Sequence, residues 1–183
     1  DKVYRNNEWN YGYRENDELG GHDPYSASKA STELVTESYR KSFSANDADA
    51  PLIASARAGN VIGGGDWTEN RIIKDAVMAA SKDKKLLIRN PNSSRPWQHV
   101  LEPLSGYLAL GAKILNDNDL NGEPFNFGPV SSQDITVKIL LQNLAEIWGW
   151  NAIDDAIKIN DSKPTFNEAG LLKLNCNKAK NLI

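Results

Sequence analysis

Residues 52–66 read LIASARAGNVIGGGD, an apolar run that passes directly into a glycine-rich stretch. The run at 52–56 is short and follows Pro51, which is typical of a strand buried on both faces. Residues 57–66 hold four glycines, and glycine lets the backbone approach another group closely. The stretch therefore predicts a buried strand whose exit borders a ligand site. A flexible turn is the alternative, because the spacing does not match a GxGxxG phosphate loop.

Strands and helices alternate outward from this stretch. The polar loop at 5–23 ends at Pro24, where a helix is expected with Asp23 as its N-cap. The helix expected at 102–115 carries Leu104, Leu108, Ala112 and Leu115 on one face. Alternation of this kind is typical of an α/β protein. The other expected elements are helices at 24–43, 69–82 and 136–148 (cap Thr136, stop Gly149), a short last helix capped by Asn177, and strands at 85–88, 125–127 and 156–159.

The composition is that of an ordinary globular domain. Of 183 residues, 40% are hydrophobic and 25% are charged, and the net charge of -3 gives no reason to propose nucleic acid as a partner. The one cysteine, Cys176, cannot form an internal disulfide, and no Cys/His cluster suggests a metal, which favours a reducing, cytoplasmic setting. No apolar run reaches the roughly 20 residues that span a bilayer. The chain opens at Asp1 rather than Met, and we expect it to be truncated.

Tyr25 and Lys29 stand four positions apart at the start of an expected helix, so their side chains lie on one face. A phenol has a pKa of about 10, and a neighbouring ammonium favours the phenolate. The pair could then move a proton to or from a sugar hydroxyl, and Lys29 could also hold a ribose. A chain with six tyrosines contains such a pair by chance about half the time. The position of Tyr25 directly after a glycine-containing loop is what favours a site.

Asp1 and Lys2 offer a carboxylate and an amine at what reads as a strand end. Neighbouring side chains on a strand point to opposite faces, so both can reach one site only if the strand has ended there. Two solvated terminal charges are the alternative.

Polar residues further along the chain suit a nucleotide. Arg95, which follows Arg89 in the same stretch, presents a planar fork that matches diphosphate oxygens, and Asn60 can both donate and accept hydrogen bonds. Asn126 stands between two aromatic residues at an expected strand end. Surface arginines are the alternative, and His99 fits a structural hydrogen-bonding residue of a strand better than a catalyst.

These elements occur in the order found in extended short-chain dehydrogenase/reductases, and the resemblance covers essentially the whole chain. Residues 20–25 (GGHDPY), 56–67 (ARAGNVIGGGDW) and 95–104 (RPWQHVLEPL) resemble the subgroup of CDP-glucose 4,6-dehydratases most closely. That subgroup also has Asp-Lys at the strand end, as at Asp1. The family's glycine-rich first βα turn, its acidic ribose-binding residue and the Ser/Thr before Asp1 are absent, so the resemblance is to the C-terminal part of the family's chain.

The resemblance implies an α/β fold made of the later half of a Rossmann-like doubly wound parallel sheet plus a smaller α/β substrate-binding lobe. Residues 1–66 would form part of the NAD-binding portion and carry the Tyr-x-x-x-Lys helix. Residues 67–183 would form mainly the nucleotide-sugar lobe, with 97–129 contributing to the sheet.

The resemblance also implies NAD-dependent dehydration of CDP-glucose to CDP-4-keto-6-deoxyglucose, by a cytoplasmic dimer or tetramer without metal, nucleic-acid or membrane partners. A nucleotide-sugar epimerase or reductase of the same fold and a non-catalytic nucleotide-sugar-binding module are the alternatives. By resemblance, the catalytic residues would be Tyr25, Lys29, Asp1 and Lys2, the NAD contacts Tyr25, Lys29 and Arg57, and the nucleotide-sugar contacts Asn60, Arg89, Arg95 and Asn126.

Overall fold

The computed structural model describes residues 2–44, 47, 49–82, 84–130, 135–150, 157–159 and 169–183. Asp1, the predicted acid, lies outside the described residues. The described elements are α1 (Pro24–Tyr39), the π-helical turn η1 (Arg40–Ser44), β1 (Ser55–Ala58), β2 (Asn60–Ile62), α2 (Ile72–Ser81), β3 (Leu86–Ile88), β4 (Trp97–His99), α3 (Leu101–Ile114), the 3-10 turn η2 (Asn118–Leu120), β5 (Pro124–Phe127), α4 (Val137–Trp148), β6 (Ile157–Ile159) and α6 (Asn177–Leu182).

The described strands pair two by two, and every pair is parallel. β1 pairs with β5, β2 with β4, and β3 with β6. At least one helix separates the two strands of each pair along the chain, because parallel strands need a long crossover connection. This arrangement confirms the predicted α/β class.

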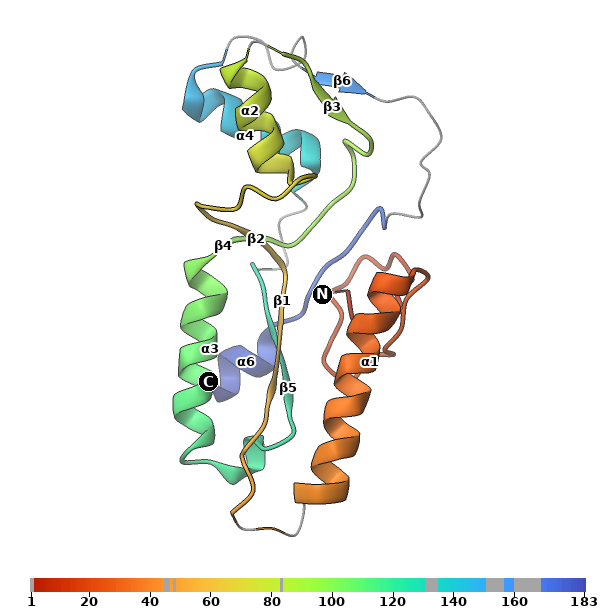
Figure 1. Ribbon diagram of the computed structural model, residues 1–183, viewed down its shortest axis with the longest axis vertical. Coiled ribbons are helices and arrows are strands. Elements are labelled where there is room, and N and C mark those ends of the chain that lie inside the picture. The colour runs from red at the N-terminus through yellow and green to blue at the C-terminus, as the bar shows by residue number, and fades with distance from the viewer. Residues whose placement is uncertain are drawn as a thin grey trace.

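Figure 1 shows the elements in two groups. Helix α1 lies on one side of the β1–β5 pair and α3 with α6 on the other, while α2, α4, β3 and β6 gather at the opposite end of the molecule. None of the helices in the described part of the chain combines the length and apolarity that crossing a membrane requires. The described residues form three buried clusters. One joins the N-terminal loop to the segment before α6 and consists of Val3, Tyr4, Tyr13, Leu172, Leu174 and Cys176; the other two are Leu110, Ile114, Leu120, Phe125 and Ala179, and Ala76, Ile88 and Leu141.

Helix α1 begins where the sequence predicts. Asp23 is the N-cap, and its carboxylate accepts hydrogen bonds from the Ser26 amide at 3.0 Å and the Ser26 hydroxyl at 2.6 Å. Pro24 occupies the first turn, where its missing N–H costs no helical hydrogen bond. The two Ser26 bonds lower the pKa of the Asp23 carboxyl, because they favour its charged form.

The cap and the stop predicted for α4 are confirmed, and the cap predicted for α6 is wrong. The Thr136 side chain caps α4 by accepting from the Ile139 amide, and Gly149 ends it in the left-handed region at φ 70°. The prediction that Asn177 caps the last helix is wrong, since Cys176 is the N-cap position of α6 and Asn177 is its first residue.

The strand predicted at 52–56 begins three residues later than expected. Its register is set by pairing of Ser55 with Pro124, which an apolar run cannot reveal. The stretch after it is also more ordered than the predicted strand exit: residues 60–62 form β2, and Gly59 donates its amide to the Phe127 carbonyl at 2.9 Å.

The residues that the sequence pattern aligns on α3 lie on its exposed side. Leu108 and Leu115 are both largely exposed. The buried side instead presents Pro103, Leu110 and Ile114. Because α3 has apolar residues around much of its circumference, periodicity alone cannot tell which of them meet the core.

We expect Asp23→Ala to lower the free energy of unfolding by about 1 kcal/mol at pH 7, because the Ser26 amide loses its acceptor. The pKa of Asp23 is lower in the folded chain, so this contribution is present above the ordinary Asp pKa and is lost as pH falls through the folded value. Denaturant titrations at neutral and strongly acidic pH measure the difference. Asp23→Asn, which keeps a capping oxygen, is the control; an equal loss for both variants would contradict the capping role.

Candidate functional site

A cleft of about 1160 Å³ runs along the glycine-rich stretch. It lies between the ends of β2 and β3, the start of α2 and the turn before β4. Its walls combine backbone, apolar side chains and several cations, which is the usual make-up of a ligand site. The residues that line it include Lys2, Asn60, Gly63, Gly64, Gly65, Asp66, Trp67, Ile72, Arg89, Asn90, Ser93, Arg95, Trp97 and Trp148.

Two glycines shape the wall of the cleft. A Cβ at Gly59 would come within 2.5 Å of the Pro96 carbonyl oxygen, so only glycine lets the segment leading into β2 run this close to the approach to β4. Gly65 adopts φ 83°, a conformation that other residues rarely take. The backbone path of residues 59–65 therefore requires glycine at Gly59 and favours it at Gly65.

Cationic side chains gather around this cleft. Lys2, Arg89 and Arg95 line it, together with Arg71 and Lys74. The last two are each close to a carboxylate: Arg71 Nε lies 3.3 Å from Asp66, and Lys74 Nζ lies 3.2 Å from Asp75. The balance of charge in the cleft is positive, which favours a ligand with anionic oxygens.

Arg95 is held firmly in this wall. It is 7% exposed, and its Nη1 donates to the Ser94 carbonyl at 2.8 Å. The backbone around it is tied to two other segments, because the Ser94 amide donates to the Gly170 carbonyl and the Arg95 amide to the Ile135 carbonyl. A guanidinium fixed in this way loses little conformational entropy when it binds an oxyanion.

Tyr25 and Lys29 lie on the first two turns of α1, and both are exposed, Tyr25 by 62%. Neither is among the residues that line the cleft, so the structure does not bring this pair together with Arg95 in one cavity. Lys2 is associated with both the cleft and the start of α1. It lines the cleft, and its charge also helps to lower the pKa of Asp23, the residue that caps α1.

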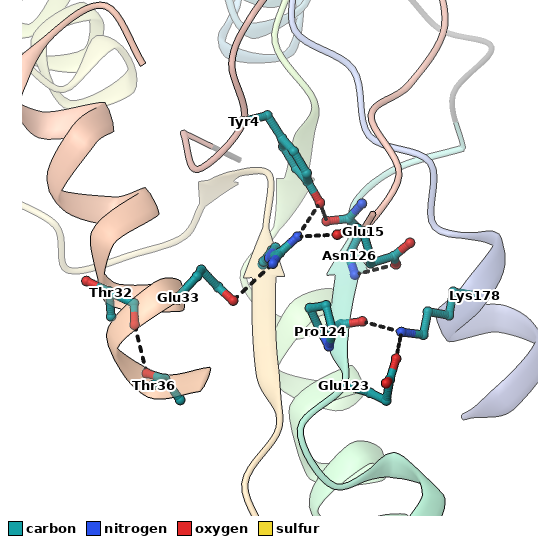
Figure 2. A network of polar contacts seen from close by, with 10 residues as sticks. Tyr4, Glu15, Thr32, Glu33, Thr36, Glu123, Pro124, Asn126 and Lys178 are labelled. Carbon is teal, nitrogen blue, oxygen red and sulfur yellow. Dashed lines mark hydrogen bonds and ion pairs between the residues drawn. The ribbon is translucent and has the colours of Figure 1, made fainter. Parts of the chain in front are cut away.

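Arg57 and Asn126, two further predicted site residues, lie in the interior and away from the cleft. Arg57 is 5% exposed, and its guanidinium donates to the Tyr4 hydroxyl, the Glu15 carbonyl and the Glu33 carboxylate, each at 3.0 Å. Glu33 extends from α1 toward this network in Figure 2. The contacts of Arg57 are thus with the protein itself.

Asn126 is completely buried, and both ends of its amide are used. Its Oδ1 accepts from the Tyr4 hydroxyl at 2.7 Å, and its Nδ2 donates to the carbonyls of Tyr13 and Asn175 (Figure 2). Its backbone amide donates to the Glu15 carboxylate at 2.8 Å. The residue joins the N-terminal loop, β5 and the C-terminal segment.

Burial and hydrogen bonding act on the pKa values of this network in different ways. It raises the pKa of Tyr4 to about 12, although the Arg57 charge acts in the opposite direction. Burial also works against the charge on Arg57, but the hydrogen bonds with Glu33 and Tyr4 outweigh it and hold the pKa of Arg57 above its usual value. Tyr4 is therefore a neutral donor at ordinary pH, and Arg57 a permanent cation.

Sequence reasoning missed Glu33 and Tyr4. Glu33 follows Lys29 by four residues and Tyr25 by eight, so all three share one face of α1, and this spacing could have identified it. Tyr4 gave no comparable signal. Among the described residues, no group of three or more His, Cys, Asp and Glu side chains is arranged to hold a metal ion.

Known proteins resemble the chain in sequence and in fold. No protein-family model matches the sequence. The chain is 45% identical over 182 residues to CDP-glucose 4,6-dehydratase from Salmonella typhimurium, and the alignment covers 98% of the chain but 50% of that enzyme. The chain thus spans about half the length of the curated relative it matches.

Solved structures show the same fold. UDP-glucuronic acid 4-epimerase from Bacillus cereus, in complex with NAD and a UDP-sugar, matches with a TM-score of 0.81 at 20% identity over 99% of the chain and 52% of its own. dTDP-glucose 4,6-dehydratase from Bacillus anthracis, in complex with NAD, matches with a TM-score of 0.75 at 20% identity over 99% of the chain and 51% of its own. The chain therefore has the Rossmann-like α/β fold of these enzymes.

We expect Glu33→Ala to destabilise the chain by about 3 kcal/mol, because it leaves the buried Arg57 guanidinium without its counter-ion. Glu37→Ala is a matched control on the same helix, since Glu37 pairs with Lys41 on the surface and should contribute less than about 1 kcal/mol. Denaturant unfolding at pH 7 measures both. Similar losses in the two variants would show that the buried pair has no special weight.

Proposed function

We propose, on the premise that the chain belongs to the extended short-chain dehydrogenase/reductases, that it is the nucleotide-sugar-binding and proton-transferring part of a CDP-glucose 4,6-dehydratase. The sequence identity with the Salmonella enzyme carries this proposal. It favours dehydration over epimerisation, because the epimerase structures resemble the chain in fold at a much lower identity. CDP-glucose would enter as substrate and CDP-4-keto-6-deoxyglucose would leave.

The cleft would hold the nucleotide sugar. Its volume of about 1160 Å³ exceeds that of a typical small-ligand site. Arg95 and Arg89 would bind the diphosphate oxygens, and Asn60 would bind a sugar or base edge with its donor and acceptor. Asn126 is completely buried and would not touch the ligand; it would hold β5 to the N-terminal loop and the C-terminal segment.

The residues of α1 fit the nicotinamide end of NAD. Tyr25 and Lys29 are both exposed and lie one helical turn apart on α1, so a ribose and a sugar hydroxyl can reach them. The sequence has no GxGxxG turn for the NAD diphosphate, so other polypeptide would complete that part of the site. When bound, NAD supplies the hydride acceptor for C4 of the sugar and the hydride donor for C6. Arg57 would position α1 through Glu33 and not contact the cofactor.

Oxidation at C4 needs a base for the hydroxyl proton. Lys29 lies one helical turn from Tyr25 on α1, so both side chains can reach the same hydroxyl and ribose. Tyr25 would then take the proton from the C4 hydroxyl as the hydride leaves C4. Because C4 stays a ketone in the product, Tyr25 would release this proton to solvent at the end of the cycle, while Asp1 would take one up from solvent. The helix N-terminus fixed by Asp23 holds both residues at the start of α1.

Elimination of water follows from the new C4 ketone, which acidifies the C5 proton. Lys2, at the cleft, would remove that proton if its amine is neutral, or would stabilise the enolate if it stays charged. Asp1 would protonate the C6 hydroxyl, which departs as water. C6 then receives the hydride and C5 regains a proton, so the net change is the loss of one water. An epimerase would keep its activity without Asp1 and Lys2.

A non-catalytic nucleotide-sugar-binding module is the second candidate. The observation that favours it for the isolated chain is that Tyr25 and Lys29 are absent from the residues that line the cleft. Titration of CDP-glucose with and without NAD, followed by analysis for the 4-keto product, separates the two.

Arg95→Ala is expected to weaken CDP-glucose binding by roughly 10- to 150-fold, the equivalent of about 1.5–3 kcal/mol for a charged hydrogen bond. Isothermal titration calorimetry on the intact chain measures the affinity. Arg5→Ala is the control, since Arg5 pairs with Glu18 on the surface. Thermal unfolding of each variant checks that the chain remains folded. Unaltered affinity in a folded Arg95→Ala chain would remove Arg95 from the site.

Tyr25→Phe should reduce turnover at least about 100-fold in an enzyme completed by the other half of the relative, because the C4 hydroxyl proton then has no acceptor. Binding of CDP-glucose should change little. Mass spectrometry of the 4-keto product measures turnover, and Tyr39→Phe, another exposed tyrosine of α1, is the control. Normal turnover in Tyr25→Phe would exclude Tyr25 as the base.

A further inference from the structure

The end of helix α4 carries a pair of stacked indoles. Trp148 is the last residue of α4, and Trp150 follows two positions later. Their ring centroids lie 5.5 Å apart, and the ring planes are inclined by 18°. This spacing lies within the range over which aromatic rings attract each other. No step of the proposed reaction uses either ring.

The turn between the two indoles holds them in place. Gly149 adopts φ 70°, the left-handed conformation in which helices commonly end. The turn brings the Trp150 amide back to the Ala145 carbonyl, to which it donates at 2.9 Å. Trp150 also packs against the buried cluster that contains Leu141. Trp148 therefore lies on a ring that both the backbone and the core keep in position.

Trp148 remains open to the cleft. It is 55% exposed, and it is one of the residues that line the cleft. Val137, the first residue of α4, also lines it, so the cleft reaches both ends of this helix. The 12 residues of α4 span about 18 Å. An indole held at one end of a cleft of this length suits a ligand that carries a flat ring.

The guanidinium expected to bind anionic oxygens is tied to the other end of α4. The Arg95 amide donates to the Ile135 carbonyl at 3.4 Å, and the Val137 amide donates to the Ser93 carbonyl at 3.0 Å. The segment that carries Arg95 thus adjoins the start of α4, whereas Trp148 is at its end. A nucleotide has anionic oxygens at one end and a flat aromatic base at the other, which matches this order.

Two other tryptophans line the cleft, and neither offers the same support. Trp67 is 68% exposed, and within the part of the chain that the structure describes no ring stacks on it. Trp97 belongs to β4, and its indole nitrogen is buried in the protein. Among the described residues that line the cleft, Trp148 is therefore the tryptophan that combines an open side with a supporting ring.

We propose that Trp148 is the platform on which the base of the nucleotide sugar stacks, and that Trp150 positions it. The inference rests on the proposed function, which assigns CDP-glucose to the cleft. Stacking on an aromatic side chain uses the face of a base and is tolerant of its identity. Trp148 would then contribute affinity for the nucleotide, and the choice among bases would fall to groups with donors and acceptors, such as Asn60.

The hexose ring is the competing occupant of the indole face. In CDP-glucose the diphosphate joins the ribose to the hexose, so the base and the hexose extend in opposite directions from the phosphates. The proposed reaction places the hexose at Lys2, on the N-terminal loop, and the diphosphate at Arg95. The base is the part of the ligand that is left for Trp148.

The experiment compares CDP with ribose 5-diphosphate, which is CDP without its base, in calorimetric titrations of the intact chain. The unmodified chain should bind CDP roughly 5- to 150-fold more tightly, the range that stacking gives per base. Trp148→Leu keeps an apolar side chain but removes the ring, and it should abolish most of this difference. Trp148→Phe keeps a ring and should retain most of it. Ile147→Ala is the matched control, since Ile147 is 84% exposed on the same helix and does not line the cleft.

Nuclear magnetic resonance gives a second measurement that needs no variant. The ring protons of cytosine in bound CDP should move upfield, because the indole ring current shields a base stacked on it, and they should show cross-relaxation with the indole protons of Trp148. Trp148→Leu should remove the upfield shift. Thermal unfolding of each variant checks that the chain remains folded.

Equal affinities for the two compounds in the unmodified chain, an unchanged ratio in folded Trp148→Leu, or no cross-relaxation with Trp148 overturns the inference and leaves the dehydratase proposal standing. A loss confined to CDP-glucose, with CDP binding unaltered, overturns it in favour of the hexose. Equal weakening of both compounds overturns it in favour of a structural role. If the unmodified chain does not bind CDP, the nucleotide site and the inference fail together. Stacking on Trp148 in a completed enzyme that forms no 4-keto product refutes the dehydratase proposal alone.

Discussion

A buried guanidinium joins the N-terminal loop, β1 and helix α1. Arg57 on β1 binds Tyr4 and Glu15 of the N-terminal loop and Glu33 of α1. A charged group with five donors cannot be left unpaired in the interior without a large cost, so these partners must be in place whenever β1 is. This one side chain therefore contacts both the loop that carries Lys2 to the cleft and the helix that carries Tyr25.

The network also gives two phenols different roles. Tyr4 is enclosed, and burial raises its pKa to about 12, which suits a fixed donor to Asn126. Tyr25 is exposed one helical turn before Lys29, which suits exchange of a proton with a ligand. The two tyrosines thus have different roles because one is buried and the other is exposed.

The sequence predicted most elements of this fold but not how they meet. Capping chemistry placed the start of α1 at Asp23, because the cap is a local interaction. The ends of β1 and the buried side of α3 depend on Pro124 and on contacts with β5, which lie far away in sequence. In the site, Lys2, Asn60, Arg89 and Arg95 do line one cleft. The resemblance places Arg57 at the cofactor and Asn126 at the nucleotide sugar, and this stays a prediction. The structure adds the long-range protein partners of both side chains, which the sequence alone does not reveal.

Asn126 has a consequence for how the chain is made. Its amide binds Tyr13 and Asn175, 113 residues before it and 49 after it, and the Tyr4 hydroxyl that binds it is 122 residues away. Contacts between such distant positions form slowly, because long loops must close first. The buried polar centre is therefore complete only once Asn175 has been synthesised and has reached β5, and without that segment the Asn126 amide would lose one of its two carbonyl acceptors.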